Sequence, residues 1–145
     1  MNLLFKKICI SSDHAGYIIK EYIKNYLIRK NIFVIDLGPK NNNSVDYPDY
    51  AKKVAKRVKQ KKSDAGILIC GSGTGMAISA NKIKGIRAAV CYNLKSTQLS
   101  RLHNNANVIC LGSRLTKKKD IKKIVISFLK TKFEGGRHLR RVKKI

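Results

Sequence analysis

The sequence predicts a single α/β domain, a Rossmann-like three-layer sandwich with about five parallel strands. Short apolar runs rich in β-branched residues alternate with longer stretches whose apolar residues recur at the i, i+3, i+4 spacing of amphipathic helices. The alternation continues over all 145 residues without an internal repeat, a linker or a low-complexity tract, and this length suits one domain. Strands that alternate with helices form βαβ units, whose right-handed crossovers place helices on both faces of a parallel sheet. We therefore expect one domain over residues 1–145.

Each expected element follows from this pattern. The apolar runs predict strands at residues 7–11, 32–37, 65–70, 86–91 and 108–111. The helical spacing predicts helices over residues 15–27, 51–58, 76–84, 94–102 and 121–129. Ser12 or Asp13 is expected to cap the first helix, because short polar side chains accept the unpaired N–H groups of a first turn. A polar loop, 38–48, should join the second strand to the second helix.

The charge of the chain is strongly positive. Thirty-two Lys and Arg residues against eight Asp and Glu give a formal net charge of +24, which raises the possibility of a polyanionic partner. However, the lysines are spread over every expected helix and loop, and the sequence has no RNA-binding aromatic motif, zinc finger or basic zipper region. We expect no dedicated nucleic-acid partner. A nucleotide- or nucleic-acid-binding module on the same sheet is the alternative from another functional class.

Composition also bears on location and cofactors. No segment approaches the roughly 20 apolar residues that span a bilayer, and the apolar start of the chain lacks a signal-peptide cleavage site. The four cysteines show no C-x-x-C spacing, so free thiols in the reducing cytoplasm are expected. The three histidines are isolated in the sequence and no Cys/His cluster has metal-ligand spacing. We expect no metal and no other cofactor.

The most informative stretch is residues 67–76. An apolar strand ends in Cys70, glycines follow at alternate positions, and a helical pattern then begins. Backbone N–H groups in such a turn approach a ligand without Cβ obstruction, and the helix dipole adds partial positive charge. Met76 stands where the dinucleotide fingerprint needs glycine, and no Gly-Lys-Ser/Thr follows as in a P-loop. The turn should therefore bind an anion, or stabilise one formed in a reaction. Its candidate residues are Gly71, Ser72, Gly73, Thr74 and Gly75.

Other polar side chains follow the predicted strands. The carboxyl ends of parallel strands share one edge of a sheet, which would gather Asp13, His14, Cys70 and Arg114. His103 and Asn104, after the helix that follows the fourth strand, are expected to join them. A cysteine thiolate beside backbone donors can serve as a nucleophile or a general base.

The C-terminal tail, residues 135–145, supplies a candidate phosphate anchor. Arg137 and Arg141 are four residues apart and would face the same way on a helical turn. Two guanidinium groups so placed suit the oxygens of a phosphate. An unstructured basic tail is the alternative.

Taken together, the chain resembles ribose-5-phosphate isomerase of type B, within the wider sugar-phosphate isomerase family that includes galactose-6-phosphate isomerase. The similar stretches span nearly the whole chain in the expected order. They are 12–16 (SDHAG), 46–48 (DYP), 66–75 (GILICGSGTG), 80–82 (ANK), 85–88 (GIRA), 100–104 (SRLHN), 107–108 (NV), 112–114 (GSR) and 133–138 (FEGGRH) with Arg141.

The resemblance implies an aldose–ketose isomerase that interconverts D-ribose 5-phosphate and D-ribulose 5-phosphate in the non-oxidative pentose phosphate pathway. Cys70 falls on the family's base, which moves a proton between C2 and C1 through a cis-enediolate. One branch uses a glutamate after the glycine loop instead, and Met76 here indicates the cysteine type. Residues 71–75 fall on the anion hole.

The resemblance also assigns the remaining candidates. His103 falls on the residue that helps to open the sugar ring, with Asp13 nearby, and Asn104 and Arg114 fall on substrate contacts. His14, Arg137 and Arg141 fall on phosphate-binding positions. The resemblance further implies a homodimer with sites built from both chains, and leaves a tetramer open. An isomerase of six-carbon sugar phosphates, such as galactose or allose 6-phosphate, is the alternative within enzymes.

Overall fold

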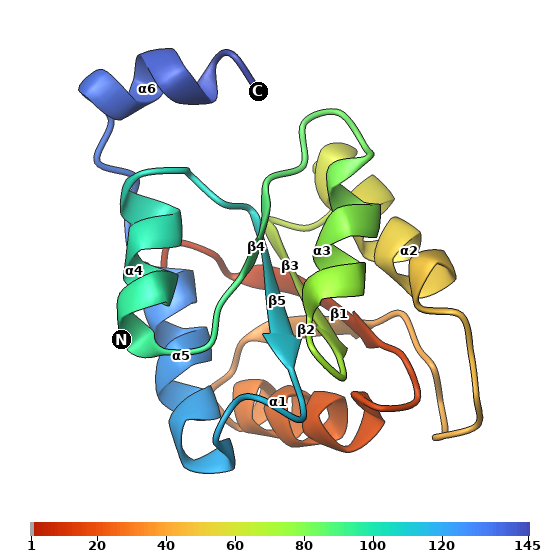
Figure 1. Ribbon diagram of the computed structural model, residues 1–145. Helices are drawn as coiled ribbons and strands as arrows, with labels where there is room; N and C mark the ends of the chain where they lie inside the picture. Colours follow the sequence, from red (N-terminus) through yellow and green to blue (C-terminus); the bar gives the residue numbers. More distant parts are fainter. Residues whose placement is uncertain (1) are drawn as a thin grey trace.

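The computed structural model describes residues 2–145, which form five parallel strands and six helices (Figure 1). The strands are β1 (Lys7–Ser12), β2 (Phe33–Asp36), β3 (Ala65–Cys70), β4 (Ala88–Val90) and β5 (Val108–Gly112). They join in the order β2-β1-β3-β5-β4, and every neighbouring pair is parallel. The central strand β3 is buried along its whole length, which explains its uninterrupted apolar sequence.

The first four helices connect successive strands, and the last two follow β5. The helices are α1 (Tyr17–Arg29), α2 (Tyr47–Lys59), α3 (Thr74–Asn81), α4 (Leu94–Leu102), α5 (Lys118–Lys130) and α6 (Arg137–Val142). None of the helices within residues 2–145 has the length and apolar character that a bilayer span requires.

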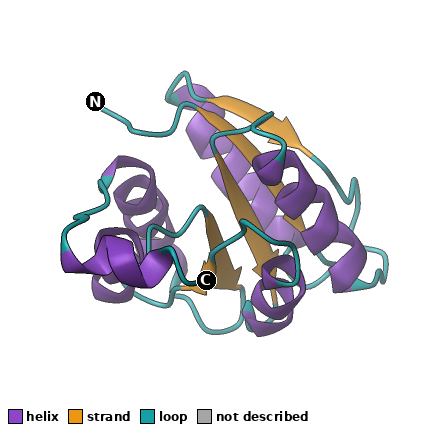
Figure 2. Ribbon diagram, turned by 90° about the horizontal axis from the view of Figure 1, so that it is seen from above, coloured by secondary structure: helices purple, strands orange, loops and turns teal. Residues whose placement is uncertain are grey.

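Helices lie on both sides of the sheet (Figure 2). The sheet separates two apolar cores, as the expected three-layer sandwich requires. Successive side chains of a strand point to opposite faces, so Ile67 and Ile69 of β3 pack with residues of α1 and α5. Leu68 and Cys70 point the other way and pack with residues of α2 and α3. The predicted fold class is therefore confirmed.

The predicted cap of the first helix is wrong. Gly16, not Ser12 or Asp13, occupies the N-cap position of α1, without a side-chain cap. The N–H of Asp13 donates to the carbonyl of Ile69 at 3.1 Å, and its carboxylate accepts the N–H of Gly16 at 3.0 Å. Gly16 itself lies against the Ile69 carbonyl with no room for a Cβ. The chain thus stays close to β3 beyond the end of β1, which delays the helix.

Three elements are shorter than expected. β2 and β4 are the outermost strands of the sheet and each pairs with one neighbour only, so each has fewer backbone hydrogen bonds to other strands than an inner strand. α3 ends at Asn81, whose side chain exchanges two hydrogen bonds with the backbone of Ala88, at 2.7 and 2.9 Å. In the tail, the helical turn expected around Arg137 forms as α6.

The register fixes which residues lie at the same end of the strands. We call the end at which the parallel strands finish the carboxyl edge and the end at which they begin the amino edge. Cys70 pairs with Gly112 and Gly66 pairs with Val108, so the carboxyl ends of β3 and β5 lie side by side. α4 returns the chain to the amino end of β5, which places His103 at the opposite edge. Four strand steps of about 3.3 Å separate the two edges by about 13 Å at least. In Figure 1, α6 lies beyond the end of α4, away from the arrowhead of β5.

Candidate functional site

The Gly-rich turn holds the thiol of Cys70 at the end of β3. The N–H of Gly73 donates to Cys70 Sγ at 3.0 Å, and the N–H of Thr74 donates to Ser72 Oγ at 3.2 Å. Gly73 has φ +81°, a left-handed conformation that favours glycine. α3 begins at Thr74, directly after this turn. The amino end of α3 and the positive end of its dipole therefore lie beside the thiol.

A cavity of about 420 Å³ opens next to this turn. It is lined by Asp13, Tyr47, Cys70, Gly71, Ser72, Gly75, Arg114 and Leu115. A Cβ on Gly75 would lie 2.7 Å from the ring of Tyr47, and one on Gly71 would lie 2.9 Å from the guanidinium of Arg114. Both glycines are therefore needed for Tyr47 and Arg114 to approach the loop. The cavity combines a thiol, backbone donors and a cation.

Two of the predicted site residues, Asp13 and His14, follow directly after β1. Asp13 is 7% exposed and lines the cavity. His14 is exposed and accepts the N–H of Val45 on Nδ1 at 3.3 Å. Tyr47 and Leu115 also line the cavity but were not predicted as site residues. Tyr47 lies in one of the stretches that carry the family resemblance, which was the available signal.

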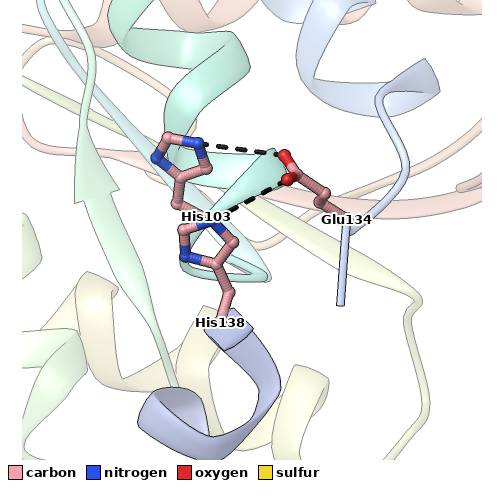
Figure 3. A group of neighbouring side chains, drawn as sticks. All are labelled: His103, Glu134 and His138. Carbon is pink, nitrogen blue, oxygen red and sulfur yellow. Dashed lines mark ion pairs between the residues drawn. The ribbon is translucent and has the colours of Figure 1, made fainter. Parts of the chain in front are cut away.

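A second cluster lies at the opposite edge of the sheet (Figure 3). The rings of His103 and His138 stack with centroids 4.2 Å apart and an interplanar angle of 12°. Each ring places Nε2 3.9 Å from a carboxylate oxygen of Glu134. The expectation that the histidines are isolated is therefore corrected. His103 and His138 are 35 positions apart in the sequence, but their rings are in contact in the fold. Neither Glu134 nor His138 was predicted as a site residue.

Burial controls the electrostatics of this cluster. Burial lowers the pKa of His138, and the neighbouring His103, Arg137 and Arg141 lower it further, whereas Glu134 opposes the shift. The imidazole of His138 is therefore held neutral at neutral pH, with a lone pair on one ring nitrogen. Arg137 and Arg141 are exposed on α6.

The structure does not bring all predicted site residues together. Asp13, His14, the 70–75 turn and Arg114 lie at the carboxyl edge, but His103, Asn104 and α6 lie at the amino edge. The expectation that His103 and Asn104 join Cys70 is wrong within one chain. The reason is topological, since a residue that follows a crossover helix has returned to the start of the next strand. Within one chain, the candidate residues therefore form two separate groups, one at each edge of the sheet.

Known proteins share this arrangement of sequence and fold. The Ribose/Galactose Isomerase family matches residues 8–145. The chain belongs to this family. It is 46% identical over 140 residues to ribose-5-phosphate isomerase B of Escherichia coli, covering 97% of this chain and 94% of that protein. It is 47% identical over 138 residues to a putative sugar phosphate isomerase of Rickettsia bellii, covering 95% of this chain and 96% of that protein.

Solved structures of isomerases superpose on the whole fold. A ribose 5-phosphate isomerase from Thermotoga maritima matches with a TM-score of 0.93 and 51% identity, covering 95% of each chain. Ribose-5-phosphate isomerase B from Mycoplasma genitalium with bound ribulose-5-phosphate matches with a TM-score of 0.92 and 48% identity, covering 95% of this chain and 92% of that one. The five-stranded parallel sheet is thus the fold of these isomerases.

The cysteines of this isomerase-family chain should differ sharply in reactivity. Cys9, Cys91 and Cys110 are fully buried, whereas Cys70 lines the cavity. Burial raises the pKa of Cys9 to about 11 and also raises the pKa values of Cys91 and Cys110. Only the thiolate is alkylated readily, so iodoacetamide should label Cys70 first under native conditions.

Peptide mass spectrometry after timed alkylation would measure this selectivity. The native protein should take up one label, and a Cys70→Ala variant should take up almost none until it is unfolded. Labelling of Cys9, Cys91 or Cys110 at the rate of Cys70 would contradict the assignment of Cys70 as the accessible thiol.

Proposed function

We propose that this chain interconverts D-ribose 5-phosphate and D-ribulose 5-phosphate, with Cys70 as the base. The observation that carries the proposal is the thiol of Cys70 beside an oxyanion-type turn, in a cavity that also presents Asp13 and Arg114. Membership of the Ribose/Galactose Isomerase family supports the reaction class. The similarity to ribose-5-phosphate isomerase B of E. coli and of M. genitalium supports the five-carbon substrate.

The reaction needs a base, an oxyanion site and a phosphate anchor, and no electron acceptor. In the open-chain aldose, the Cys70 thiolate takes the proton from C2, and the C2–H electron pair becomes the C1=C2 bond of the enediolate. Negative charge collects on O1, where backbone N–H groups of residues 71–75 stabilise it. The proton then returns to C1, the O2–H proton passes to O1, and C2 becomes the carbonyl of the ketose. Oxidation at C2 balances reduction at C1.

The proposal includes a homodimer that completes each site. The carboxyl-edge half holds Cys70 and its turn, and the amino-edge half holds His103 and the arginines of α6. A two-fold contact between the carboxyl edge of one chain and the amino edge of the other would form two identical sites. In this arrangement, His103 of the partner subunit moves a proton during ring opening, close to Asp13.

The partner's basic groups would bind the far end of the substrate. Arg137 and Arg141 are one helical turn apart on α6 and both exposed. With His14 from the first chain they would surround the phosphate, where several directed donors suit its oxygens. Asn104 and Arg114 would contact the sugar hydroxyls. We further propose that residues 1–145 act as one domain, in which residues 135–145 bind the phosphate. The four free thiols suit the reducing cytoplasm, which we propose as the location.

The first test is an assay of purified protein on ribose 5-phosphate, with EDTA present and ribulose 5-phosphate as the measured product. We expect turnover with EDTA, since every step uses groups of the protein. Allose 6-phosphate and galactose 6-phosphate should be converted with lower kcat/KM. A higher kcat/KM on a six-carbon substrate would replace the five-carbon assignment, and no turnover on any sugar phosphate would contradict the proposal as a whole.

A further inference from the structure

We propose that His103, Glu134 and His138 form a Zn²⁺ site whose occupation inhibits the enzyme. One potential ligand atom from each residue lies within 4.8 Å of the other two. The two His Nε2 atoms approach the two oxygens of Glu134, each at 3.9 Å (Figure 3). Two imidazoles and one carboxylate match a ligand set that zinc uses at three-ligand sites with an open fourth position.

The distances suit a small cation between the three side chains. Bonds of about 2.0–2.2 Å in a tetrahedral site put neighbouring ligand atoms about 3.4 Å apart. The observed 3.9 Å is too long for a direct hydrogen bond. The three ligand atoms lie within 4.8 Å of one another, so binding would draw them together by up to about 1.4 Å. His103 has the more exposed ring, so it can tilt from the stack toward a shared ion.

His138 gives an independent indication of a ligand. Its side chain is 6% exposed, and within residues 2–145 its Nε2 atom is buried with no hydrogen-bond partner. An unpaired buried nitrogen is unfavourable, and a metal ion would satisfy it. Arg137 and Arg141 act against any cation here, so we expect reversible binding rather than a permanently held structural metal.

Binding would have a direct consequence for the proposed reaction. Zinc on Nε2 of His103 removes the lone pair that carries the proton in ring opening. The inhibitory role therefore rests on the proposed function, whereas the metal site itself does not. The site is not evident in the sequence because its three residues come from separate elements. His103 caps the end of α4, Glu134 lies in the loop between α5 and α6, and His138 lies in α6.

Zinc binding is measured first, by equilibrium dialysis of EDTA-stripped Cys70→Ala protein, which removes the competing thiol. We expect about one Zn²⁺ per chain. Loss of an outer-shell partner alone weakens metal sites about 10–100-fold, so Glu134→Gln or His138→Ala in this background should weaken binding by about 100-fold or more. His14→Ala, which removes the histidine at the opposite edge, is the matched control and should bind like its parent. No zinc binding by the parent, or equal binding by all variants, would overturn the site.

Inhibition is measured separately, on protein that retains Cys70. Micromolar Zn²⁺ should inhibit the wild-type isomerase, excess EDTA should restore the rate, and Glu134→Gln should shift the inhibitory concentration upward by the factor found in dialysis. The carboxylate of Glu134 is 54% exposed, so this variant should fold even if His138→Ala does not. An unshifted inhibitory concentration would overturn the inhibitory role, since zinc would then act at Cys70. Binding without any isomerase activity would instead refute the proposed function and leave the metal site standing.

Discussion

Replacing Cys70 with alanine should abolish isomerisation and leave substrate binding intact. The proposed base is the sulfur that accepts the N–H of Gly73 beside the cavity, and alanine can accept no proton. General base catalysis contributes about 10²–10⁴-fold, so kcat for ribose 5-phosphate should fall by at least that factor. The loss should appear in kcat, because the substitution leaves the proposed substrate-binding groups, His14, Arg114 and the arginines of α6, in place. The measurement is ribulose 5-phosphate formation, with EDTA present.

Two controls make this prediction sharp. Cys91→Ala removes another buried cysteine that is not among the cavity's lining residues, and it should keep activity close to that of the wild type. Calorimetric titration of Cys70→Ala with ribitol 5-phosphate, which has no carbonyl group to isomerise, should give an affinity close to the wild-type value. Full activity in Cys70→Ala would mean that another group is the base, whatever the family suggests.

Local sequence patterns predicted the strand, turn and helix around Cys70 at the carboxyl edge. Cys70 and its glycines are consecutive in the chain, and β3 is buried on both faces. The position of the turn at the carboxyl edge follows from strand polarity alone. The N-cap of α1 could not be read in the same way, because it depends on how closely Gly16 approaches β3, a contact between distant segments.

The cluster of His103, Glu134 and His138 at the amino edge could not be predicted from local sequence patterns. His103 is the C-cap of α4, and His138 is on α6 beyond α5. Their contact depends on the crossover of α4 and on the path of the tail, neither of which has a sequence period. In the proposed dimer a second chain would bring this cluster to Cys70, and no pattern within one chain encodes how two copies meet.

The proposal of a site shared between two subunits leads to the second major prediction, that two inactive variants restore activity when combined. Cys70→Ala and His103→Ala homodimers each lack one group in both sites, and each should lose about 10²–10⁴-fold in kcat. Unfolded together and refolded, the chains should pair at random, so that half of the dimers are mixed. In a mixed dimer one site has both groups and the other has neither. One quarter of all sites is then intact, and the mixture should recover about a quarter of the wild-type rate.

The recovery separates a shared site from a site within one chain. The matched control combines Cys70→Ala with a Cys70→Ala/His103→Ala double variant, which leaves every site without its thiol however the chains pair. That mixture should stay inactive after the same refolding. If Cys70 and His103 of the same chain worked together, mixing the single variants would also restore nothing, because no chain holds both groups. Refolded wild-type protein shows whether refolding itself restores the rate. If it does and the mixture of single variants stays inactive, the two-chain site is refuted. Recovery near one quarter would require that Cys70 and His103 act from different subunits.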